Sequence, residues 1–451
     1  MLRKSLFFLL FITIIIFASY FSLAAKYKYD VTQDYQYALK NSPHTAIEVL
    51  LKQGKFTFNS PESWDTGFIK LKVSATLSGY FSEPYVEIIT GQQHSILSFE
   101  RGVQGERYIN LPSIDMHKKK IQLIAHHLSI KDQQANVILF SNPNMQKQAR
   151  VLVIAPHPDD AEIAAFGFYS HHNSLILTIT AGEAGPHTYD EIYATANQHY
   201  LAKGKLRVWN SITVPMLGGV SPEYAINLGY FDDTLKQMAE SKALSVKSRH
   251  TDIESVNHFR GQNLSSLTPT SEGKANWPAL IKDIKQLIQN YKPDIIVTPY
   301  PALDWHFDHK FATIAVITAI KQLKLQQGQL FLYTNHFTTN NYFPYGQQGE
   351  LVPIPPDFNQ SLYFDSIYSY KLPQPKEKIF ALEAMNDLRL DTSWLSISGA
   401  FKILWRTLGN KLLLKDQTYY RRAVRENELF LVVNFSSLYS EEVTNSLNGE
   451  K

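Results

Sequence analysis

Short apolar segments alternate with segments of helical length from residue 150 onward, and this rhythm restricts the fold more than any other feature of the 451-residue chain. The expected strands are 151–156, 174–180 and 294–300, and the expected helices are 160–170, 190–210, 277–291 and 309–323. Such alternation is typical of α/β domains, whose parallel strands are buried on both faces. We therefore expect an α/β fold with a Rossmann-like, mostly parallel sheet and flanking helices.

Residues 30–147 have a different pattern. Short β-branched or aromatic segments are separated by clusters of Gly, Pro, Asn and Ser; they lie at 56–58, 68–77, 85–90, 95–100 and 121–130. This spacing predicts an all-β accessory domain, either a sandwich or a small barrel. Glycan or partner binding and plain structural support are both open as its role.

The first 25 residues read as an export signal. Arg3 and Lys4 precede an apolar run of about 20 residues that ends at Ala25. We expect a signal peptide or a signal anchor, with membrane attachment through residues 5–25, and an exported body that is periplasmic or anchored to the outer face of the inner membrane. The remaining chain then divides into the α/β domain at 150–395 and a C-terminal extension at 396–451.

Composition removes several classes of site. The chain has no cysteine, which excludes disulfides, thiolate zinc sites, iron–sulfur clusters and a cysteine nucleophile. Any metal must therefore be held by His, Asp or Glu. The balance of 44 Lys and Arg against 41 Asp and Glu gives no reason to expect a nucleic-acid partner.

The segment from Pro156 to Glu162 reads Pro-His-Pro-Asp-Asp-Ala-Glu and lies where an expected strand ends and a helix begins. Ligands bind at this edge of parallel α/β sheets, since the loops converge there. His157, Asp159 and Asp160 thus face the expected site. Adjacent carboxylates repel each other, and a cation would relieve that repulsion. Capping of the helix by the two acids is an equally good interpretation of this segment alone.

A second cluster favours the metal interpretation. His306, Asp308 and His309 follow the expected strand 294–300, at the same edge of the sheet. One histidine could bind a metal while a carboxylate orients the other. Two such clusters predict a shared His/Asp/His metal site with an open position. Nitrogen and carboxylate ligands suit catalytic Zn2+, with Fe2+ or Mn2+ also possible.

At these residues the chain resembles the PIG-L/LmbE-like family of zinc-dependent de-N-acetylases, of the N-acetylglucosaminyl deacetylase type. The resemblance rests on the two His/Asp motifs, on Thr-Ala-Gly-Glu-Ala-Gly at 180–185 and on Leu-Gly-Tyr-Phe-Asp at 228–232, and it covers about 150–330. Two departures are Phe307, where the family often has Pro, and the sequence Ala-Ala-Phe-Gly at 164–167.

The resemblance implies a role for each motif residue. His157, Asp160 and His309 would bind zinc, and Asp159 would be the general base toward the attacking water. His306, oriented by Asp308, would stabilise the oxyanion. The identity of the general acid, Asp159 or His306, stays open.

The function expected from these features is removal of an N-acetyl group from an amino sugar of an envelope glycan or glycolipid. Two alternatives stay open. One is a zinc amidase or esterase that acts on a non-sugar substrate. The other is a non-catalytic glycan-binding envelope protein.

Overall fold

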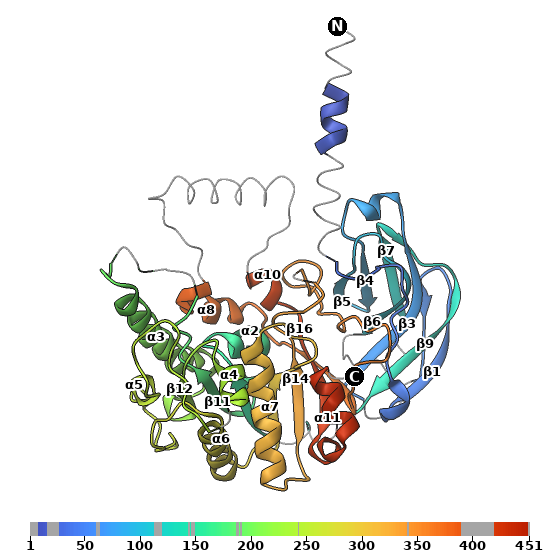
Figure 1. The fold of residues 1–451 in the computed structure, drawn as a ribbon. Coiled ribbons are helices and arrows are strands. Elements are labelled where there is room, and N and C mark those ends of the chain that lie inside the picture. The colour runs from blue at the N-terminus through green and yellow to red at the C-terminus, as the bar shows by residue number, and fades with distance from the viewer. Residues whose placement is uncertain are drawn as a thin grey trace.

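The computed structural model describes residues 8–15, 27–59, 64–111, 120–142, 145, 149–185, 189, 192–241, 243–340, 342–388 and 419–449. A strand-rich part built from residues 45–140 stands beside a part in which helices surround a central sheet (Figure 1). The predicted mixed α/β class and the strand-rich N-terminal region are confirmed.

The predicted signal segment is described only at residues 8–15, which form a helix, and the rest of it lies outside the described residues. Among the residues that are described, no helix combines the length and the apolar character needed to cross a bilayer.

The central sheet has seven strands in the order β12-β11-β10-β13-β14-β16-β15. Their bounds are β10 (Arg150–Ala155), β11 (Asn173–Thr180), β12 (Ala225–Tyr230), β13 (Ile295–Pro299), β14 (Gln329–Tyr333), β15 (Ser366–Lys371) and β16 (Asn427–Asn434). The first five strands of this order pair in parallel, whereas β14·β16 and β15·β16 are antiparallel. Neither β12 nor β16 was among the expected strands.

Among the described strands, parallel pairing is confined to this sheet. Over all described sheets antiparallel pairs are more numerous, so the Rossmann-like, mostly parallel fold expected for the chain is not confirmed. The strand β16 also pairs directly with β14, and the boundary expected at residue 396 therefore does not separate two sheets. The other domain boundaries stay predictions.

Helices cover the faces of the central sheet, and their starts follow local sequence rules. For example, the Asn276 side chain accepts a hydrogen bond from the N–H of Ala279, and Pro278 occupies the first turn, where no N–H partner is needed. The helices are α2 (Asp160–Ser170), α3 (Ala196–Thr213), α4 (Leu235–Glu240), α5 (Asn257–Arg260), α6 (Trp277–Tyr291), α7 (Phe307–Gln322), α8 (Glu377–Ala384), α10 (Tyr419–Ala423) and α11 (Glu441–Asn448).

The strand-rich part is a sandwich of two antiparallel sheets. One sheet has the order β1-β9-β3-β6, with β8 paired to β3, and the other has the order β2-β7-β4-β5. The bounds are β1 (Thr45–Leu51), β2 (Lys55–Phe56), β3 (Thr66–Ala75), β4 (Tyr85–Thr90), β5 (Gln93–Ser98), β6 (Gln104–Leu111), β7 (Ile121–His126), β8 (Leu128–Ser129) and β9 (Gln133–Phe140). Of these, β1, β6 and β9 were not expected.

Alternation along the strands decides which side chains enter the sandwich core. Ile69, Leu71 and Val73 of β3 face the core between the two sheets. Phe68 and Tyr108 point to the opposite face, where they join the core cluster of the central sheet. The two parts of the molecule therefore share apolar packing.

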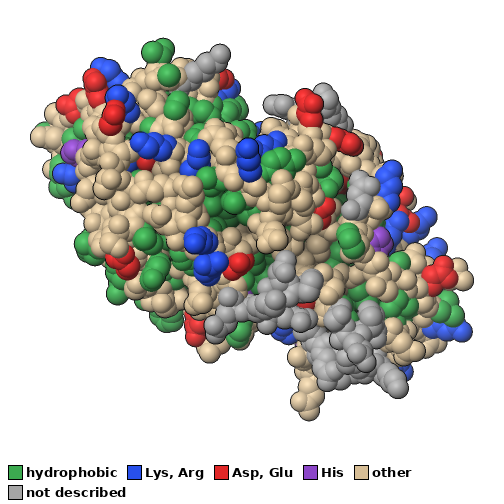
Figure 2. Space-filling view, turned by 90° about the horizontal axis from the view of Figure 1, so that it is seen from below, with side chains coloured by type: hydrophobic (Ala, Val, Ile, Leu, Met, Phe, Trp, Pro, Cys, Tyr) green, Lys and Arg blue, Asp and Glu red, His purple; other side chains and the backbone are tan. Residues whose placement is uncertain are grey.

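The surface carries charges of both signs. Basic and acidic side chains are scattered over the face seen from below (Figure 2). This distribution agrees with the small net charge of +3, so this face does not present a field of a single sign.

Candidate metal centre

The order of the central sheet explains why the two motifs meet. After β10 the chain passes through α2 to β11 on one side, and after β13 it passes through α7 to β14 on the other side. Neighbouring strands whose connections diverge in this way leave a crevice at their carboxyl ends. His157 follows β10, and residues 306–309 begin α7 after β13, so both motifs lie at this crevice.

Three donor atoms converge there. His157 Nδ1 lies 3.2 Å from His309 Nε2, and Asp160 Oδ2 lies 3.3 Å and 3.1 Å from these two nitrogens. The three side chains are buried. The structure thus brings together the three residues that the family resemblance names as ligands.

The opposite nitrogens of both imidazoles contact carboxylates. His157 Nε2 lies 3.0 Å from Asp232 Oδ1, and His309 Nδ1 lies 2.8 Å from Asp304 Oδ2. A proton on each of these nitrogens would leave a lone pair on His157 Nδ1 and on His309 Nε2. Two nitrogen lone pairs and a carboxylate oxygen then face one another, and a cation between them satisfies all three.

The spacing fits a metal ion. Zinc–ligand distances of about 2.0–2.1 Å at tetrahedral angles place neighbouring donors about 3.3–3.4 Å apart. The three separations of 3.1–3.3 Å are close to that value. His306 adds a further donor within 4.8 Å of those of His157 and His309. The His/Asp cluster could therefore hold a metal ion.

Burial and charge act together on the titration of these groups. Burial opposes a charged imidazolium, but the Asp160 and Asp304 carboxylates raise the pKa of His309 to about 10. Burial also disfavours a charged Asp160, yet the two histidines hold its pKa well below its usual range. The same carboxylates would favour a bound cation.

Asp159 is the N-cap of α2 and has a backbone φ of 150°. This region is rarely adopted by residues other than glycine, and such strain often marks functional sites. The carboxylate is held by Arg207, whose Nη2 lies 3.0 Å from Asp159 Oδ2. Arg207 also donates to the carbonyl oxygens of Pro158 and Gly182, so its guanidinium is fixed on several sides.

The contact between His306 and Asp308 differs from the expected one, in which the Asp308 carboxylate orients the imidazole. The backbone N–H of Asp308 donates to His306 Nδ1 at 3.2 Å, which is an N-cap bond of α7. The Asp308 carboxylate instead accepts from the N–H groups of Asp233 and Leu235 and lies 3.3 Å from His157 Nε2. The prediction that the Asp308 carboxylate orients His306 is thus wrong in its detail. The N-cap bond leaves the His306 proton on Nε2.

Four residues of the site were not among the predicted site residues: Arg207, Asp232, Asp304 and His336. Asp232 was noticed only as the end of the 228–232 segment, and Asp304 was not noticed, although it precedes the second motif by two residues. His336 follows β14, and its ring centroid lies 4.9 Å from that of His309. Its position after the end of a third parallel strand could have identified His336 from the sequence. Arg207 lies inside a helix, and nothing in the sequence pattern distinguishes it as a site residue.

Two further buried acids flank the site. Burial raises the pKa of Glu162 to about 8. Burial and the nearby Asp232 charge raise the pKa of Glu183 to about 8. Glu183 accepts hydrogen bonds from the Asp232 N–H and the Ser248 hydroxyl, so it supports the loop that carries Asp232.

Residues 152–320 match the family model described as PIG-L, GlcNAc-PI de-N-acetylase. This match contains all six predicted site residues and confirms the resemblance to the PIG-L/LmbE-like family. It suggests a de-N-acetylase of the hydrolase class and supports an enzyme that acts on substrates containing N-acetylglucosamine.

No curated protein matches the chain. Among solved structures, the hydratase GalB from Pseudomonas putida KT2440 is 9% identical, with a TM-score of 0.34; the alignment covers 63% of this chain and 96% of GalB. The acetyl xylan esterase Est2A from the rumen bacterium Butyrivibrio proteoclasticus is 10% identical, with a TM-score of 0.17 and coverage of 68% and 86%. Scores this low carry no argument about fold or function.

Proposed function

We propose that this protein is a zinc-dependent hydrolase that removes an N-acetyl group from an amino sugar of an envelope glycan or glycolipid. The observation that carries the proposal is the triangle of donor atoms from His157, Asp160 and His309, within a segment that matches the de-N-acetylase family model. A reactive amide and an activated water would meet where these donors converge.

His157, Asp160 and His309 would hold the ion. A bound zinc ion would lower the pKa of a water toward neutrality and polarise the acetamide carbonyl. Asp159, fixed by Arg207, accepts the proton of the water as its oxygen adds to the carbonyl carbon. His306 donates from Nε2 to the carbonyl oxygen. The carbon–nitrogen bond then breaks, and the proton passes from Asp159 to the leaving nitrogen. The products are a free amine and acetic acid, which ionises to acetate by releasing its proton to solvent.

An exposed aromatic ring beside the site supports a sugar substrate. The Trp305 side chain is 53% exposed, and its ring centroid lies 5.5 Å from that of His306 and 5.4 Å from that of His336. Its flat apolar face suits stacking against the apolar face of a pyranose ring. A sugar held on Trp305 would have its substituents next to His306.

The envelope location is part of this proposal and rests on the N-terminal sequence. Arg3, Lys4 and the apolar run to Ala25 support export. Residues 1–30 fused to a reporter that functions only outside the cytoplasm should give an active fusion. An inactive fusion would contradict this part.

The catalytic assignment is tested by Asp159→Asn. We expect acetate release from N-acetylglucosamine oligomers to fall about 10²–10⁴-fold while zinc content stays at that of the unmodified protein, because Asp159 moves a proton rather than binding the ion. Asp294→Asn, at an exposed carboxylate next to Arg150, is the matched control and should change neither quantity. Full activity of the Asp159→Asn variant would contradict the mechanism. Zinc without acetate release in the unmodified protein would favour an amidase or esterase of another substrate class.

A further inference from the structure

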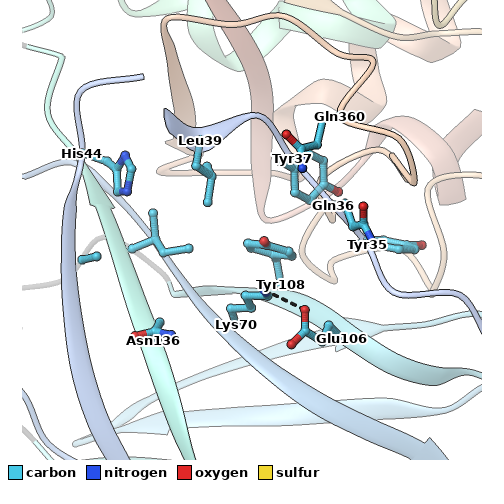
Figure 3. Close-up of a pocket in the computed structure, with 12 residues that line it drawn as sticks. Tyr35, Gln36, Tyr37, Leu39, His44, Lys70, Glu106, Tyr108, Asn136 and Gln360 are labelled. Carbon is cyan, nitrogen blue, oxygen red and sulfur yellow. Dashed lines mark ion pairs between the residues drawn. The ribbon is translucent and has the colours of Figure 1, made fainter. Parts of the chain in front are cut away.

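A cavity lies on the strand-rich part, away from the metal-binding motifs. Its volume is about 600 Å³, which is within the range of small-molecule sites. One side is formed by strands β3, β6 and β9, and the other by residues 35–39 and Gln360 (Figure 3). Residues from distant parts of the sequence thus enclose one groove.

The floor of the groove is a row of side chains across three strands. Lys70 of β3 pairs in register with Asn136 of β9 on one side and with Tyr108 of β6 on the other. Because side chains at paired positions share a face, these three point to the outer face of the sheet. Ile138 adds an apolar surface two residues beyond Asn136.

The charges in the floor compensate each other. Lys70 Nζ lies 2.6 Å from Glu106 Oε2, and it lies 5.9 Å from the centre of the Tyr108 ring. The groove therefore places a neutral ion pair beside the buried Tyr108 ring, and it offers no net charge to attract an anion or a cation.

The walls add amide groups that can both donate and accept hydrogen bonds. Gln36 and Gln360 lie across the groove from the strands, and both are exposed, as is Asn136 in the floor (Figure 3). Amides can pair with hydroxyl and acetamido groups, which also donate and accept. A neutral, polyhydroxylated ligand is the chemical class that this lining complements.

We propose that this groove binds an uncharged oligosaccharide, as a binding subsite separate from the metal centre. The choice of an N-acetylated sugar as the probe rests on the proposed function.

The test is calorimetric titration of the full chain with the N-acetylglucosamine hexamer. The Asp159→Asn background prevents turnover during the measurement. Asn136→Arg places a long charged side chain in the floor at an exposed position, and it should weaken the groove-binding event at least tenfold. Gln134→Arg is the matched control, because Gln134 is exposed on the same face of β9 two residues away but does not line the groove. It should bind within twofold of its parent.

Equal binding by the Asn136→Arg and Gln134→Arg variants would overturn the inference, and so would no binding of the hexamer outside the metal centre. Binding that weakens steeply with added salt would also contradict a neutral ligand site. The proposed function is tested apart from this, by acetate release from a monomeric N-acetylglucosamine glycoside, which is too short to occupy both sites. Failure of that assay leaves the groove measurement intact.

Discussion

The metal centre and the groove on the strand-rich part differ in the burial and the charge of their polar side chains. At the metal centre, His157, Asp160 and His309 are buried and held by neighbouring acids, and three donor atoms point at one another. In the groove, the amides are exposed and the charged pair of Lys70 and Glu106 is already neutral. Burial of several electron-pair donors around one point therefore favours binding of a cation. Exposed amides and a neutral ion pair can form hydrogen bonds with a ligand, but they do not activate it.

The largest effect should come from Asp160→Ala, which removes one donor from the triangle. Zinc content should fall from about one per chain to near zero, and acetate release should fall at least about 10³-fold, since both water activation and carbonyl polarisation are lost. Hexamer binding in the groove should persist. Loss of hexamer binding together with acetate release would show that the two regions are not independent. An Asp160→Ala variant that keeps its metal would show that Asp160 is not a ligand.

The second prediction concerns the free energy of unfolding and its dependence on pH. Burial raises the pKa of Glu183 in the folded protein from its ordinary value of 4.5 to about 8. The folded state therefore holds the proton more tightly, so this stabilising contribution is present below about pH 4.5 and is lost as pH rises to about 8.

Glu183→Gln should flatten that pH dependence and, above pH 8, raise the free energy of unfolding by a few kcal/mol on an order-of-magnitude basis. Chemical denaturation at pH 5 and pH 8.5 measures both quantities. Glu240→Gln, at an exposed side chain of α4, is the control and should leave the slope unchanged. Parallel slopes for the Glu183→Gln variant and the unmodified protein would show that this acid is not held neutral by its surroundings.

Arg207→Met should lower kcat for acetate release about 10²-fold, because a misplaced general base loses its alignment with the water. Metal content should not change, since Arg207 contacts Asp159 and backbone carbonyls rather than the donor triangle. Arg207→Lys keeps the charge and should restore part of kcat. The exposed Arg150→Met is the control. A rise in KM without a change in kcat would assign Arg207 to substrate binding instead.

A smaller effect is expected at the rim of the metal centre. Trp305→Ala should raise KM for N-acetylglucosamine oligomers about tenfold with little change in kcat, because a stacking contact is made equally in the ground and transition states. Trp305→Phe should retain most of the affinity. Trp209→Ala, at an exposed tryptophan of α3, is the control. Unchanged KM in the Trp305→Ala variant would remove the structural support for a sugar at this rim.

The sequence predicted the parts of the fold that local pattern controls. The helices α2, α6 and α7 begin and end within two residues of expectation. For α6 the reason is local, because Asn276 caps the helix and Leu280, Ile284 and Leu287 form a buried apolar stripe. The strands β12 and β16 were missed, and so was the antiparallel edge that β16 forms with β14 and β15. The position of β16 beside β14 depends on tertiary packing between distant segments, and the local spacing of apolar residues does not predict such packing.

The candidate site shows the same division. His157 follows β10, and Asp160 and His309 lie in the first turns of α2 and α7. Their two clusters were predicted from residue type and position, and the family resemblance named the three as ligands. Asp304 and Asp232 act by holding those histidines, and this role depends on side-chain contacts across the crevice. The orientation of the Asp308 carboxylate toward residues 233–235 follows from the packing of α4 against α7, which no local motif encodes.

The central claim is that the triangle of His157, Asp160 and His309 binds a catalytic metal ion. Elemental mass spectrometry of the purified full chain, with acetate release from N-acetylglucosamine oligomers measured on the same sample, tests it most directly. The account predicts about one zinc per chain, and acetate release that is lost with a chelator and restored by added zinc. A chain that binds no metal even after incubation with zinc would contradict the account.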